Sequence, residues 1–148
     1  MTQYKFSSIG GGVMGEALLS RLLARQIYSP AEVLVSEPAP QRRDFLAQTY
    51  GVHVTDDNQA ALDSEVLLLA IKPQVFSDVV AQLAPIEHYP LVISILAGVP
   101  LSQLEAAFPQ CPVIRTMPNT PATVGAGITA IAAGTRVQPQ HLETCRQI

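Results

Sequence analysis

Four glycines lie within six positions near the start of the chain, in the stretch IGGGVMG, and glycine-rich turns of this kind can bind phosphate groups. Gly10, Gly12 and Gly15 fit the pattern G-x-G-x-x-G. In that pattern the first glycine permits a tight turn, the second lets a diphosphate approach the backbone, and the third lets a helix pack against a strand. A glycine-rich turn without a ligand is the alternative. We expect the diphosphate of a dinucleotide to bind along this loop, whose residues are Gly10, Gly11, Gly12, Val13, Met14 and Gly15.

An acidic residue, Glu37, follows the glycine cluster at the spacing typical of dinucleotide-binding folds. A carboxylate there accepts hydrogen bonds from the adenosine ribose and repels a 2′-phosphate. The expected cofactor is therefore NAD(P)H, with NADH slightly favoured by Glu37. A solvated loop carboxylate is the alternative. Arg42 and Arg43 would favour the 2′-phosphate, but we expect them to lie on the next helix and to face solvent.

Apolar and amphipathic segments alternate along the chain, and this alternation predicts the elements that position the glycine loop. Strands are expected over residues 4–9, 32–36, 52–54, 65–71, 91–96, 112–117 and 127–134. Helices are expected over residues 16–27, 39–50, 73–84 and 100–108, with another beginning at residue 138. This order predicts an α/β fold of the Rossmann type, with a doubly wound, mostly parallel sheet and helices on both faces. Ser7 and Ser8 are unusually polar for the central strand of such a sheet.

The composition argues against several classes of function. The chain has 148 residues, the size of one domain, and a net charge of −3. This charge does not attract a nucleic-acid backbone, and no apolar run approaches the roughly 20 residues needed to cross a bilayer. The first residues lack the pattern of an export signal, so we expect a cytoplasmic protein that acts on a small-molecule substrate.

The remaining reactive residue types form no catalytic or metal-binding pattern. Cys111 and Cys145 are expected to be reduced, structural thiols, and the three histidines are far apart in the sequence. Asp56 and Asp57 are adjacent and point apart in an extended chain, so they do not form an acid–base pair. We therefore expect no metal and no catalytic side chain, and a bound cofactor that supplies the chemistry.

Several segments stand in an order that has a known counterpart. They are IGGGVMGEALLSRLL, AIKPQ, SILAGVPLSQLE and IRTMPNTPATVGAGITAI, of which MPNTP at Met117–Pro121 is the most specific. Together they resemble the amino-terminal domain of the pyrroline-5-carboxylate reductase family. The resemblance implies reduction of 1-pyrroline-5-carboxylate to L-proline, the last step of proline biosynthesis, by a nicotinamide cofactor. It also implies that residues 1–148 are the NAD(P)-binding domain and that the family's helical carboxy-terminal dimerisation domain is absent from this chain.

The resemblance assigns cofactor contacts to residues beyond the glycine loop. Asn58 matches an asparagine at the adenosine end. The other matches are Ala70, Lys72 and Pro73 after the fourth expected strand, Ala97 and Gly98 after the fifth, and Asn119 and Thr120 near the nicotinamide. Each polar match has a simpler alternative, because Lys72 can be a solvated side chain, Asn58 a helix cap, and Asn119 and Thr120 donors or acceptors within a turn.

The chain departs from the family at two residues and in its extent. Glu37 stands where a small polar residue accommodates the 2′-phosphate, and Leu96 replaces a small residue, which would crowd the nicotinamide. Because nothing matches the dimerisation domain, we expect this chain to be a monomer that binds dinucleotide weakly and catalyses poorly, and the full-length protein to be a homo-oligomer. A non-catalytic NAD(P)-binding protein and a dehydrogenase related to 6-phosphogluconate dehydrogenase are alternatives, although the latter does not explain MPNTP.

Overall fold

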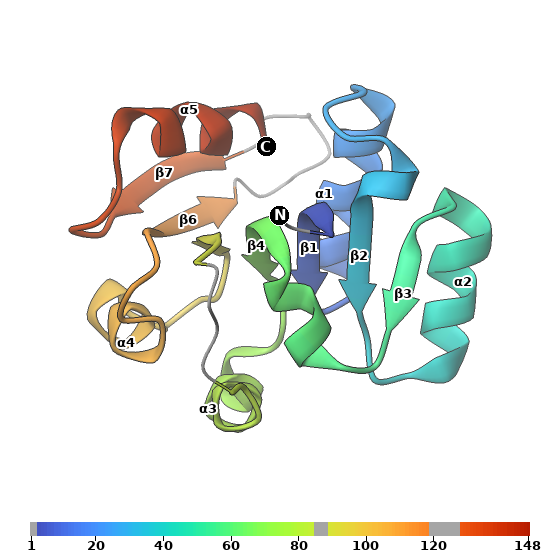
Figure 1. Ribbon diagram of the computed structural model, residues 1–148, viewed down its shortest axis with the longest axis horizontal. Coiled ribbons are helices and arrows are strands. Elements are labelled where there is room, and N and C mark those ends of the chain that lie inside the picture. The colour runs from blue at the N-terminus through green and yellow to red at the C-terminus, as the bar shows by residue number, and fades with distance from the viewer. Residues whose placement is uncertain (1–2, 85–88, 119–127) are drawn as a thin grey trace.

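A seven-stranded sheet organises the computed structural model, which describes residues 3–84, 89–118 and 128–148 (Figure 1). The strands are β1 (Tyr4–Ile9), β2 (Val33–Ser36), β3 (His53–Thr55), β4 (Ser64–Leu69), β5 (Leu91–Ser94), β6 (Val113–Pro118) and β7 (Ile128–Ala133). Their order is β3-β2-β1-β4-β5-β6-β7, and only the β6–β7 pairing is antiparallel. The predicted α/β fold with a mostly parallel sheet is confirmed.

Within the described residues, five α-helices follow strands in the order that the sequence predicts. They are α1 (Val13–Ala24), α2 (Pro40–Tyr50), α3 (Phe76–Ala81), α4 (Leu101–Ala107) and α5 (Pro139–Gln147), and three short 3₁₀ turns are η1 (Pro30–Glu32), η2 (Asn58–Leu62) and η3 (Pro73–Val75). Helix α2 begins with Pro40 in its first turn and ends at Gly51, whose φ of +73° is left-handed.

The helix predicted over 73–84 is instead divided between η3 and α3. Val75 lies at the junction with φ −98° and ψ 0°, outside the α-helical region, so the two consecutive segments do not form one continuous α-helix. Strand β5 also ends earlier than predicted, because the N–H of Leu96 bonds to the Ser94 hydroxyl and the chain leaves the sheet.

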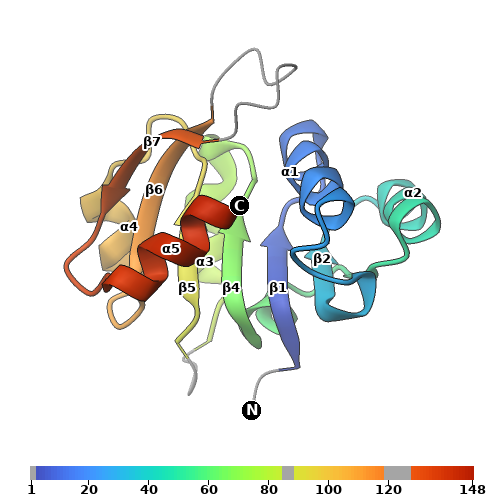
Figure 2. The ribbon, with the colours of Figure 1, turned by 90° about the horizontal axis from the view of Figure 1, so that it is seen from above.

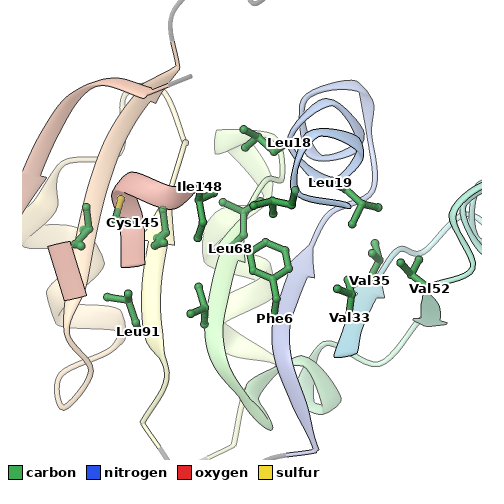
Figure 3. Packing of buried hydrophobic residues seen from close by; sticks show 14 of the residues in the cluster. Phe6, Leu18, Leu19, Val33, Val35, Val52, Leu68, Leu91, Cys145 and Ile148 are labelled. Atoms are coloured by element: carbon green, nitrogen blue, oxygen red, sulfur yellow. The ribbon is translucent and has the colours of Figure 1, made fainter. Parts of the chain in front are cut away.

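Helices cover both faces of the sheet (Figure 2), as predicted. Buried residues of α1, α2 and α5 form one apolar cluster with the sheet, and those of η2, α3 and α4 form a second cluster on the other face. Figure 3 shows the first cluster, in which Phe6 and Leu68 of the central strands lie near Leu19 of α1 and Ile148 at the end of α5. Burying each such large side chain stabilises the fold by about 2 kcal/mol.

The two serines of the central strand are fully buried. The Ser8 hydroxyl donates a hydrogen bond to the carbonyl oxygen of Gly10 at 2.8 Å, so it supports the turn that follows β1. The Ser7 hydroxyl has no hydrogen-bond partner among the described residues. Of the two buried serines, Ser8 therefore has a structural role in the turn after β1.

The chain leaves the sheet in opposite directions after β1 and β4, which are adjacent. The loop after β1 leads to α1 on one face, and the turn after β4 leads to η3 and α3 on the other face. In open α/β sheets, ligands bind at the point where neighbouring strands diverge in this way, outside the carboxyl ends of the strands. The glycine loop lies at this point.

Among the described residues, none of the helices is long and apolar enough to cross a membrane. The described part of the chain also contains no group of three or more His, Cys, Asp or Glu residues that could hold a metal ion. Cys111 and Cys145 are buried free thiols, and burial raises the pKa of each to about 11.

Candidate cofactor-binding site

Gly10 and Gly15 occupy positions that leave no room for a side chain. Gly10 has a φ of +108°, and a Cβ built on it would lie 2.5 Å from the carbonyl oxygen of Ala70. A Cβ built on Gly15 would lie 2.8 Å from the carbonyl oxygen of Gly10. The loop therefore turns tightly against the end of β4, and α1 packs directly onto the loop.

Gly12 differs from these two glycines because it borders open space. Apart from its two chain neighbours, no described residue has an atom within 4 Å of a Cβ built there. Its φ of −78° and ψ of −165° are accessible to any residue, so the conformation does not require glycine. Gly12 is the N-cap of α1 and makes no side-chain cap hydrogen bond, and the next residue, Val13, is 86% exposed. The first turn of a helix carries N–H groups without intrahelical partners, so this end of α1 can receive an anion.

Gly11 is buried against the core beneath the loop. A Cβ built on it would lie 2.7 Å from Cδ1 of Leu46 in α2 and 3.2 Å from Cγ1 of Val35 in β2. The G-x-G-x-x-G pattern gives this position no role, so sequence reasoning missed its packing function. The available signal was a glycine at the x position between Gly10 and Gly12, where the pattern does not require one.

Glu37 lies beside the glycine loop, at the end of β2. Its Oε1 accepts a hydrogen bond from the N–H of Gly11 at 3.0 Å, and its Oε2 accepts one from the N–H of Ala39 at 2.9 Å. Glu37 is thus a partly buried carboxylate that two backbone N–H groups hold in place. Because each carboxylate oxygen has two acceptor positions, both oxygens keep capacity for a ribose hydroxyl.

Arg42 and Arg43 lie on α2 as predicted, but the prediction that they face solvent is wrong. The Nε of Arg42 donates to the carbonyl oxygen of Gly11 at 2.6 Å, and its Nη2 pairs with the carboxylate of Glu16 on α1. The Nη1 of Arg43 donates to the carbonyl oxygens of the two residues after β2, at 2.8 and 3.0 Å. Both guanidinium groups thus bond to carbonyl oxygens that the sheet and helices leave unpaired.

Glu16 connects α1 to α2 through two partners. The hydroxyl of Tyr50 donates to one oxygen of its carboxylate, and Arg42 donates to the other. These hydrogen bonds, that of Tyr50 first, hold the pKa of Glu16 below its usual range. The same hydrogen bond raises the pKa of Tyr50. Glu16 therefore remains ionised and paired beside the first turn of α1.

Asn58 lies at the start of η2, next to the end of β2. Its Oδ1 accepts from the Ser36 hydroxyl at 2.6 Å, and its Nδ2 donates to Oε1 of Gln82 at 3.2 Å. The alternative that Asn58 caps the following helix is wrong, because Asp57 holds the N-cap position and accepts from the N–H of Gln59 at 3.0 Å.

Three of the matched residues form the turn after β4. The N–H of Ala70 donates to the carbonyl oxygen of Ile9 at 2.9 Å, which joins this turn to the end of β1. Lys72 is exposed and precedes η3, and Pro73 is the first residue of η3. This turn therefore lies beside the glycine loop, with the Lys72 side chain in solvent.

The turn after β5 exposes Ala97 and Gly98, and Gly98 has a φ of +77°. The expectation that Leu96 would crowd the nicotinamide is wrong, because Leu96 is 1% exposed and packs in the core cluster of α3 and α4. Asn119 and Thr120 lie outside the described residues.

The arrangement suits an extended dinucleotide. The glycine loop supplies open backbone for a diphosphate, and Glu37 and Asn58 lie on the side of β2, where an adenosine binds in folds of this type. The turns after β4 and β5 extend the same edge of the sheet in the other direction.

Comparisons with known proteins agree with this geometry. The family model described as "NADP oxidoreductase coenzyme F420-dependent" matches residues 5–98. A pyrroline-5-carboxylate reductase of Synechocystis sp. is 57% identical over 141 residues, which are 95% of this chain and 53% of that protein. The structure of a pyrroline-5-carboxylate reductase from Coxiella burnetii has a TM-score of 0.84 and 30% identity, and covers 98% of this chain and 56% of the other.

A third similar structure is that of Plasmodium falciparum pyrroline carboxylate reductase with NADP bound. It has a TM-score of 0.79 and 22% identity over 97% of this chain and 53% of the other, so it supports the fold alone. The chain spans about half the length of these relatives. The resemblance to pyrroline-5-carboxylate reductases is confirmed, and because the family model matches more than half of its residues, the chain belongs to the NADP oxidoreductase family that this model describes.

Proposed function

We propose that this chain is the cofactor-binding part of a pyrroline-5-carboxylate reductase, which reduces 1-pyrroline-5-carboxylate to L-proline with NAD(P)H. The geometry that supports cofactor binding is the contrast between Gly10, where a side chain is excluded, and Gly12, which borders open space at the start of α1. The identity of 57% to the Synechocystis reductase supports the substrate. The loop Gly10–Gly15 would then hold the diphosphate through backbone N–H groups.

In this proposal, the bound cofactor supplies a hydride for the carbon of the substrate's C=N bond. The contribution of the chain is to position the cofactor and to shape its surroundings. Glu37 and Asn58 would hold the adenosine end, and the turns with Ala70, Lys72 and Pro73 and with Ala97 and Gly98 would border the rest of the cofactor. Asn119 and Thr120 are proposed for the nicotinamide end, on the resemblance alone.

Glu37 supports a preference for NADH over NADPH. Its carboxylate lies at the end of β2 and is fixed by two backbone N–H groups, so it cannot turn away from a 2′-phosphate without losing those bonds. A phosphate placed beside it would meet a like charge. Lys72 is the exposed cation of the neighbouring turn, and it would favour anionic parts of either cofactor.

Equilibrium titration of the chain with each cofactor, followed by cofactor fluorescence, tests this preference. We expect NADH to bind about fivefold more tightly than NADPH, and E37Q, which removes the charge, to reduce that ratio to about one. The matched control is E65Q, since Glu65 is exposed on β4 far from the loop, and it should keep the wild-type ratio. Equal affinities in the wild-type chain would contradict the role given to Glu37.

Assay of the chain with 1-pyrroline-5-carboxylate and NADH tests the reaction. We expect slow oxidation of NADH with formation of proline, because the chain has half the length of its reductase relatives. Cofactor binding without proline formation at saturating substrate would favour a non-catalytic NAD(P)-binding protein. Turnover of 6-phosphogluconate instead would favour the other dehydrogenase.

The oligomeric state and the cellular location of the protein are part of the same proposal. We propose that the chain alone is monomeric, that the full-length protein is a homo-oligomer, and that the location is cytoplasmic. Two buried free thiols suit a reducing compartment. Sedimentation of the chain tests the monomer, and a tight dimer would contradict it.

A further inference from the structure

The peptide groups of Gly11 are held from both ends by side chains of opposite charge. On the amino side, Oε1 of Glu37 accepts from the N–H of Gly11 at 3.0 Å. On the carboxyl side, Nε of Arg42 donates to its carbonyl oxygen at 2.6 Å. Both side chains belong to the β2–α2 corner, 26 and 31 residues away in sequence.

These bonds determine the direction of a neighbouring donor. In a trans peptide the C=O and N–H groups point in opposite directions. Arg42 binds the carbonyl oxygen of Gly11, so the N–H of Gly12 in the same peptide points away from Arg42. Around Gly12 no described atom lies within 4 Å of a Cβ position. The bond from Arg42 therefore limits rotation of the peptide whose N–H borders the open space.

Arg42 is itself held in place. Its Nη2 pairs with Glu16, whose other oxygen accepts from Tyr50, and its guanidinium lies 5.1 Å from the centre of the Phe45 ring. Its side chain is 29% exposed, and that of Glu16 is 24% exposed. The ion pair with Arg42 also neutralises the negative charge of Glu16, which otherwise would repel an anion at the first turn of α1.

We infer that Arg42 is a positioning residue for the diphosphate of the cofactor: it fixes the Gly11–Gly12 peptide through the Gly11 carbonyl oxygen and does not itself contact the ligand. This inference rests on the proposed cofactor site. In this role Arg42 also neutralises the charge of Glu16 beside the loop. Because its donors bond to Gly11 and Glu16, we do not assign Arg42 to a 2′-phosphate.

The test measures the affinity of the chain for NADH, ADP and AMP by calorimetry. We expect R42M to bind NADH and ADP about tenfold more weakly and AMP within about twofold of wild type, because AMP has no diphosphate. R42K keeps the charge but cannot bond to Gly11 and Glu16 together, so it should also lose about fivefold for ADP. R25M removes an exposed arginine at the end of α1 as a matched control, and it should leave all three affinities unchanged.

E16Q separates positioning from the joining of α1 to α2. It removes the charged partner of Arg42 but leaves the bond to Gly11, so it should bind ADP as tightly as wild type or more tightly. If E16Q weakens ADP binding as much as R42M does, Arg42 acts by joining the helices and the inference fails. Spectra of ¹⁵N-glycine-labelled chain should show the Gly12 amide signal displaced in R42M and not in R25M.

The outcomes also separate this inference from the proposed function. Wild-type chain that binds neither NADH nor ADP would contradict the proposed function. The wild-type chain can bind both ligands while R42M either binds ADP as tightly as wild type or loses ADP and AMP affinity to the same extent. Either result would contradict the role of Arg42 and leave the proposed function standing.

Discussion

The two edges of the parallel sheet are built differently. At the carboxyl edge, the glycine loop and the β2–α2 corner are joined by hydrogen bonds, and the open space there borders backbone at Gly12. At the amino edge, a pocket of about 390 Å³ lies between α3 and α4 and has a mainly apolar lining, including Leu62, Val80 and Phe108. A hollow of this volume therefore lies at the edge that lacks the glycine loop.

This difference has a physical cause. A diphosphate is recognised by N–H groups and the positive end of a helix, and these can be presented by a shallow surface. The amino-edge pocket offers few polar groups, and Cys111, which lines it, has a pKa raised by burial to about 11. The thiol therefore stays neutral at physiological pH, and none of the described lining residues is a lysine or arginine that could pair with an anionic cofactor.

Among the substitutions that test the difference between the two edges, G12V should have the largest effect on the affinity for NADH. Valine is compatible with the Gly12 backbone conformation, but its side chain would fill the space proposed for the diphosphate. We expect the affinity for NADH to fall at least about 100-fold, which corresponds to about 2.7 kcal/mol, with the melting temperature within a few degrees of wild type. Retained affinity in a folded G12V chain would show that the cofactor binds elsewhere.

G10A should reduce folding stability, whereas G12V should fill ligand space. Its Cβ would meet the Ala70 carbonyl oxygen at 2.5 Å, in a backbone conformation with φ of +108°. We expect the free energy of unfolding in urea to fall by about 2–4 kcal/mol. G12A is the matched control, because the same methyl group there meets no described atom within 4 Å. Equal stabilities of G10A and G12A would show that the turn is not constrained as described.

The amino edge is tested by F108A. Phe108 is 5% exposed and lines the apolar pocket, so its truncation should lower the free energy of unfolding by about 3 kcal/mol. Because the pocket is at the opposite edge from Gly12, the NADH affinity of the folded variant should change less than about twofold. A large loss of NADH affinity in a variant with an unchanged fold would indicate that the cofactor binds at the amino edge.

Much of the fold could be predicted from the sequence, because apolar periodicity and glycine positions are local signals. The strand β4 and the end of α2 at Gly51 are examples. The boundaries of α3 and β5 were less predictable, since they depend on the backbone conformation of Val75 and on the Ser94 hydroxyl.

The candidate site was predictable where its chemistry is local and unpredictable where it depends on contacts between elements. The spacing of Gly10, Gly12 and Gly15 indicated the loop, and the position of Glu37 followed from the end of a strand. The bond from Arg42 to Gly11 could not be derived, because it joins two elements whose relative placement is set by packing. The inward direction of Leu96 was missed for the same reason.

The most direct test is a crystal structure of this chain with NADH. We expect diphosphate oxygens within hydrogen-bond distance of the backbone N–H groups at Gly12 to Met14, with the Glu37 carboxylate beside the adenosine ribose. A dinucleotide seated in the apolar pocket between α3 and α4, or a glycine loop that makes no contact with the bound dinucleotide, would contradict this expectation.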